Sequence, residues 1–111
     1  MTLVTPAARE FLAKEFSHLA DFGAELGENG ALLASHAQRL LEHAAEAQGY
    51  VARGLDPGPR LELVESAAKD LRAMASATAR AKFSGYLQAV LQRGVQFLGS
   101  AALGVVRKVL L

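Results

Sequence analysis

The spacing of the apolar residues is the feature that most restricts what this chain can fold into. Leu12, Phe16 and Leu19 begin a series in which apolar side chains recur at intervals of three and four residues. Those intervals are the period of one face of an α-helix. The series continues along most of the sequence, and the alternation of period two that is typical of half-buried strands persists nowhere. The spacing therefore predicts an all-α fold.

Two segments interrupt the helical spacing clearly. Residues 27–30 place two glycines around a glutamate and an asparagine, which is typical of a helix end followed by a turn. Residues 53–59 contain two prolines and two glycines, and proline lacks the amide proton that a helix interior needs. These breaks predict a first helix over 6–26, a second over 30–52 and a loop over 53–59.

Residues 60–111 allow two interpretations. The Ser84-Gly85 pair permits a break or a kink without requiring one. A single helix of this length would be about 75 Å long at 1.5 Å per residue, which is too long for a compact monomer and would imply assembly. We therefore favour two helices, over 60–82 and 84–111, and predict one domain, 1–111, folded as an antiparallel three- or four-helix bundle.

The last expected helix, 84–111, is the most apolar. Two apolar rows run side by side along it, and its polar stripe is narrow. A band this wide exceeds what a helix at the periphery of a protein needs, so we expect this helix to be the most buried and to pair in a homodimer. The residues predicted to contact a partner are Phe97, Leu98, Leu103 and Val106.

The charges are divided unevenly along the chain, although the net charge is only +1. Residues 1–70 carry all eleven acids and six bases, whereas residues 71–111 carry six bases and no acid. These bases are dilute and have no aromatic residues interleaved with them, so the pattern does not favour nucleic-acid binding. We expect the bases to face the acids of the first two helices.

The histidines raise the alternative of a small metal-binding helical bundle. Glu15 and His18 are three residues apart and share a helical face, and His36 and His43 are seven apart and share another. A carboxylate di-iron bundle needs two such pairs and two further glutamates, which the acid-free last helix cannot complete. Zinc would need three or four of these side chains to converge. We therefore favour no metal and no cofactor.

Catalysis has no recognisable signature in the sequence. The chain has no cysteine, and none of its serines lies in a Gly-x-Ser-x-Gly turn. Ser17 and His18 are adjacent, and neighbours on a helix do not face each other. No glycine-rich loop follows a strand to hold a phosphate. We expect neither an enzyme nor a small-molecule substrate.

Binding to a membrane surface is the other alternative function. Residues 94–106 are thirteen without a charge, whereas a spanning helix needs about 20 apolar residues. The N-terminus has no signal-peptide pattern, which favours a cytoplasmic location. Segment 83–111 could nevertheless lie on an anionic membrane surface, since it combines apolar and basic residues.

These observations favour a non-catalytic protein–protein interaction or scaffold module. We expect it to self-associate through its apolar C-terminal helix, so that the partner is a second copy or another helical protein.

Overall fold

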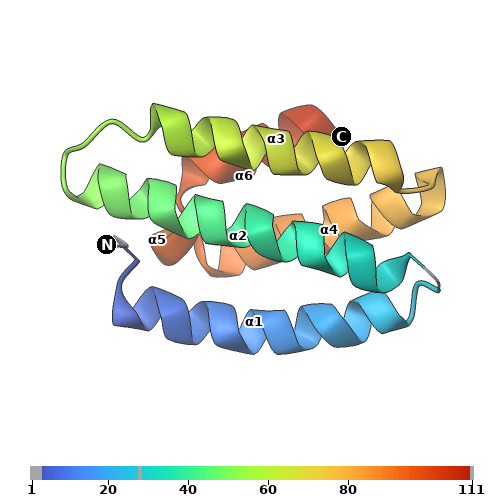
Figure 1. Cartoon of the computed structure of the whole chain (residues 1–111). Coiled ribbons are helices and arrows are strands. Elements are labelled where there is room, and N and C mark those ends of the chain that lie inside the picture. The colour runs from blue at the N-terminus through green and yellow to red at the C-terminus, as the bar shows by residue number, and fades with distance from the viewer. Residues whose placement is uncertain (1–3, 28, 111) are drawn as a thin grey trace.

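The helices of this chain lie side by side and pack compactly (Figure 1). The computed structural model describes residues 4–27 and 29–110, and within those residues all regular structure is helical, which confirms the predicted all-α fold. The elements are α1 (Pro6–Ala24), α2 (Gly30–Ala52), α3 (Gly58–Met74), α4 (Ala77–Arg93), α5 (Val95–Leu98) and α6 (Ser100–Leu110). Helix α2 lies between α1 and α3, α5 packs against α2, and α6 packs against α3 and α4.

Helix α1 begins where the sequence predicts. The Thr5 hydroxyl oxygen accepts a hydrogen bond from the Ala8 amide at 3.1 Å, and Pro6 occupies the first helical position. The cap satisfies one of the free amides at the helix start, and proline has no amide to satisfy. Leu12 and Leu19, which the spacing placed on one face, are both buried.

Two glycines allow α1 and α2 to approach each other closely at the turn that joins them. A Cβ atom built on Gly23 would lie 2.6 Å from the carbonyl oxygen of Gly30 and 2.9 Å from the Cβ of Ala34. Nothing larger than a hydrogen fits there, because atoms in a protein interior are already close-packed. The absence of a side chain at Gly23 therefore fixes the distance between the ends of the two helices.

The loop between α2 and α3 lies where the sequence predicts it. Gly54 adopts a positive φ of 71°, which glycine reaches without steric cost. One carboxylate oxygen of Asp56 accepts a hydrogen bond from the Gly58 amide at 2.9 Å, and α3 begins at that residue.

The prediction of a break at residues 83–86 is wrong. Helix α3 ends at Met74, and Ser76 caps α4 by accepting a hydrogen bond from the Ala79 amide at 3.2 Å. Phe83 and Ser84 lie inside α4 and are buried. A side-chain cap at Ser76 supplies a partner for a helix-end amide, whereas a break at Ser84 would remove Phe83 from the core.

The prediction of one helix over 84–111 is also wrong, because the segment divides at two glycines. Gly94 separates α4 from α5, and a Cβ at this position would collide with the ring of Phe11. Gly99 separates α5 from α6 with φ at 81° and ψ at 151°, a conformation that side-chain-bearing residues rarely adopt. The reversal at Gly99 returns the chain over α3 and α4.

Helix α2 forms the middle of the core. It contributes nine buried residues and is covered by α1, α3 and α5. The segment predicted as the last and most buried helix contributes eleven buried residues over 84–110, divided among α4, α5, α6 and the glycines that separate them. Each large apolar side chain fully buried in this way contributes about 1.5–3 kcal/mol.

The close approach at Gly23 yields a test of this packing. We expect Gly23→Ala to lower the free energy of unfolding by about 1–3 kcal/mol, because the added methyl overpacks the contact with α2. Gly85→Ala is the matched control, since a Cβ there meets nothing within 4 Å, and it should stabilise α4 by up to about 1 kcal/mol. Urea unfolding followed by circular dichroism measures both, and equal effects would contradict the close contact.

Candidate functional site

The four residues considered as metal ligands are dispersed. His18 is exposed on α1, His36 and His43 are partly buried on α2, and Glu15 is buried in the core. Within residues 4–27 and 29–110, no three histidine, aspartate or glutamate side chains gather closely enough to hold a metal ion. The Nδ1 atom of His43 is buried and has no hydrogen-bond partner among those residues, but one nitrogen does not provide the three or four ligands that zinc requires.

Glu15 instead forms an ion pair with an arginine far along the chain. The Nη2 atom of Arg93, at the end of α4, donates to the two carboxylate oxygens of Glu15 at 2.9 and 3.1 Å. The Glu15 side chain is 7% exposed and that of Arg93 is 55% exposed. Burying an unpaired carboxylate costs free energy, because the charge loses its contact with water. The positive charge of Arg93 therefore allows Glu15 to be buried where α1 meets α4.

Tyr86 completes this cluster. Its hydroxyl donates to the backbone oxygen and to one carboxylate oxygen of Glu15, each at 3.5 Å. Its ring stacks on Phe22 with centroids 4.7 Å apart, and Phe22 in turn meets Phe83 edge to face at 5.1 Å. Burial raises the pKa of Tyr86 above its ordinary value of 10.0, and the neighbouring Glu15 charge raises it further. The cluster ties α1 to α4.

The raised pKa of Tyr86 predicts how stability depends on pH. The neutral phenol is favoured in the folded chain, so its contribution is fully present below pH 10 and is lost as pH rises through the folded-state pKa. We expect the free energy of unfolding to fall above pH 10 by more in the wild type than in Tyr86→Phe. Denaturant unfolding at stepped pH measures this difference, and parallel curves for the two proteins would refute it.

The four residues predicted to contact a partner are mostly used within the chain. Leu98 and Val106 are 1% and 0% exposed and belong to the core. Phe97 is partly buried, with its ring centroid 5.3 Å from that of Phe11. Leu103 is partly buried at the edge of α6. Because the chain reverses at Gly99, much of the apolar band over 84–111 packs against other helices of the same chain. These four residues therefore do not form one continuous exposed surface.

Helix α6 retains one exposed face. We call this the α6 face, and it consists of Ser100, Ala101, Gly104, Arg107 and Lys108. Partly buried Leu103 and Val105 form its two edges. A Cβ built on Gly104 would meet nothing within 4 Å, so packing inside the described chain does not account for a glycine in the middle of this helix. Glycine at that position disfavours helix by up to about 1 kcal/mol relative to alanine.

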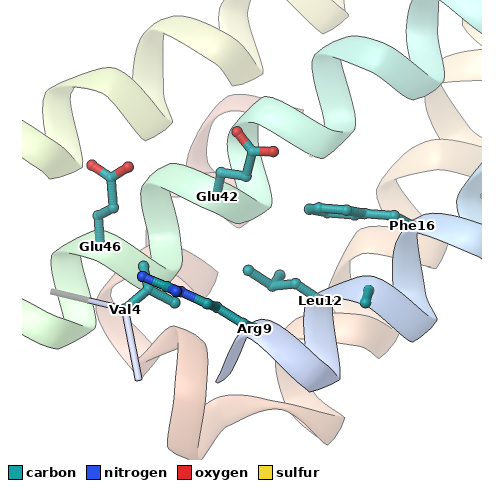
Figure 2. A pocket seen from close by; sticks show the side chains of 7 residues that line it. Val4, Arg9, Leu12, Phe16, Glu42 and Glu46 are labelled. Atoms are coloured by element: carbon teal, nitrogen blue, oxygen red, sulfur yellow. The ribbon is translucent and has the colours of Figure 1, made fainter. Parts of the chain in front are cut away.

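An open groove runs between α1 and α2, and Figure 2 shows its wider part. This part has a volume of about 300 Å³, with Leu12, Ala13 and Phe16 of α1 forming its apolar floor. A second cavity of about 180 Å³ lies farther along the same two helices, and small side chains such as Ala20 and Ala31 line it. Phe16 lines both cavities, so they adjoin, and we call them together the α1–α2 groove.

Charged side chains border the wider part of the groove. Glu42 and Glu46 project from α2, and Arg9 reaches across from α1 (Figure 2). Glu46 is held by Arg60 at 3.3 Å, and a hydrogen bond from Arg60 to Tyr50 raises the pKa of Arg60. Glu42 accepts only a long hydrogen bond from Gln38, at 3.4 Å, and it has no cationic partner within the described part of the chain.

The signals for these surfaces in the sequence were weak. Arg93 could be suspected as the partner of Glu15 only because residues 71–111 contain bases without acids. The small residues Ala20 and Ala31, which line the farther part of the α1–α2 groove, belong to no recognisable motif in the sequence.

Two further findings bear on function. No helix in the described ranges is long and apolar enough to cross a membrane. Comparisons of the chain with protein-family models, curated proteins and solved structures found no match.

Proposed function

We propose that the chain is a non-catalytic helical bundle, antiparallel in its arrangement, that acts as an interaction or scaffold module and self-associates through its C-terminal helix. The partner is a second copy or another helical protein. The observation that carries this proposal is the α6 face, on which Gly104 stands open between two apolar edges. A helix whose face centres on a glycine lets another helix approach closely, because the distance between helix axes depends on the side chains at the contact.

The α6 face differs from the surface that the sequence indicated. Leu103 belongs to both, but exposed Gly104 and partly buried Val105 take the place of Leu98 and Val106, which are buried. The sequence hypothesis rested on uncovered apolar area, whereas the present proposal rests on the shape of the face. We infer a dimer as the simplest assembly, since paired copies are the commonest oligomers.

A bulky side chain at Gly104 tests this proposal. We expect Gly104→Gln to leave the monomer folded, because its side chain enters open space, and to raise the Kd of self-association at least about tenfold by holding the partner helix away. Gly85→Gln on α4 is the matched control, since that glycine is equally open. Sedimentation equilibrium over a range of concentrations measures the Kd. Equal association by both variants would exclude the α6 face.

Contact with an anionic membrane surface is a second candidate, favoured by the bases at one end of the fold. Arg107 and Lys108 lie on the α6 face, and Arg72 of α3 donates to the Val109 backbone oxygen at 3.3 Å. Three bases therefore gather near the end of α6, in the acid-free part of the sequence. Such clusters attract anionic lipid headgroups.

Vesicle binding separates the two candidates. If the bases serve a membrane, the chain should co-sediment with phosphatidylserine vesicles at low salt, and Arg107→Glu/Lys108→Glu should abolish binding. The interaction should weaken as salt rises to about 0.15 M, where the screening length falls to about 8 Å. Phosphatidylcholine vesicles are the control. Failure to co-sediment at low salt would remove this candidate.

A further inference from the structure

We propose that the α1–α2 groove is the receptor for the α6 face of a second copy, so that self-association joins two different surfaces. This inference rests on the proposed function and adds the identity of the opposing surface. Three properties of the groove carry it, namely its length, the small residues along its farther part and the charges at its wider end.

The length of the groove matches that of α6. The α1 residues that line it run from Arg9 to Ala20, a distance of about 16 Å at 1.5 Å per residue. Helix α6 extends over eleven residues and is therefore also about 16 Å long. A helix from a second copy can thus lie along the whole groove.

The shapes are complementary along the farther part of the groove. Ala20 and Ala31 line it there, and Ser100 and Ala101 occupy the first turn of the α6 face. Small residues on both sides allow the backbones to approach closely. Leu103 and Val105, at the edges of the α6 face, can then bury more of their surface beside Phe16, which contributes about 25 cal/mol for each Å² of apolar area.

The charges fix the direction in which α6 would lie. Arg107 and Lys108 stand in the last turn of α6. Glu42 borders the wider part of the groove and has no cationic partner within the described ranges, whereas Glu46 beside it is already paired with Arg60. Only the orientation that points the C-terminus of α6 toward Arg9 places these bases near Glu42.

The division of charge along the sequence supports a second copy as the occupant. Residues 1–70, which include those that line the groove, carry an excess of acids, and residues 71–111, which include α6, have bases as their only charged side chains. Opposite charges on the two surfaces favour association of the matched faces and oppose pairing of like faces. This contact closes the inferred dimer when each copy places its α6 in the groove of the other, so that the pair of contacts has twofold symmetry.

A charge-reversal pair tests the proposal by sedimentation equilibrium, with circular dichroism confirming that each variant is folded. Glu42→Lys should raise the Kd of self-association about tenfold or more, because the introduced ammonium group would face the bases of the incoming α6. Glu10→Lys, an equal charge change at an exposed α1 residue outside the groove, is the matched control and should associate like the wild type. Arg107→Glu/Lys108→Glu should weaken association as Glu42→Lys does.

Mixing the two weakened variants provides the decisive measurement. The unaltered groove of the Arg107→Glu/Lys108→Glu variant then meets the unaltered α6 of Glu42→Lys, and the altered groove meets an α6 of opposite charge. An equimolar mixture should therefore recover association to within about threefold of the wild-type Kd. Wild-type association by Glu42→Lys alone would overturn the groove as receptor while leaving α6-mediated association intact. A wild-type chain that remains monomeric at millimolar concentration would instead overturn the proposed function itself.

Discussion

The reversal of the chain at Gly99 is the constraint on which the rest of the structure depends. Leu98 before it is buried in α5, which packs against α2, whereas Ala102 and Val106 after it are buried in α6, which packs against α3 and α4. These different neighbours require the backbone to change direction between the two helices. The turn uses a positive φ that only glycine adopts readily. An unbroken helix over this segment would leave one of its two apolar rows facing water. The hydrophobic effect therefore selects a folded-back C-terminal segment, and a glycine makes that arrangement possible.

This arrangement determines which surfaces remain for binding. The core uses one side of α6, so the other side presents small and basic residues rather than large apolar ones. Leu12, Phe16 and Leu19 of α1 line the α1–α2 groove, whose wider part is bordered by acids from α2. The cluster of Glu15, Tyr86 and Arg93 stabilises the contact between α1 and α4. These are the surfaces on which the proposed self-association depends.

Local patterns in the sequence predicted the first half of the fold better than the second. Periodicity and the proline-rich loop placed α1, α2 and the start of α3 within a few residues. The α3–α4 connection was missed because Ala75 continues an alanine-rich stretch and Ser76 alone is a weak signal, whereas Ser84 and Gly85 resemble a break. The reversal at Gly99 was missed because its cause is tertiary burial. For the same reason Glu15 was considered a metal ligand, since no local pattern reveals a partner 78 residues away.

That separation between Glu15 and Arg93 has a consequence for how the chain acquires its structure. On a ribosome adding about 5–20 residues per second, the carboxylate is made roughly 4–16 seconds before its guanidinium. During that interval the first helices can form, but the inner side of α1 must stay hydrated because burying an unpaired carboxylate is unfavourable. Docking of α1 onto α4 is thus a late event with a large loop to close. We therefore expect the N-terminal helices to complete their packing only after the C-terminal helices have been made, so that both halves of the chain reach the folded state together.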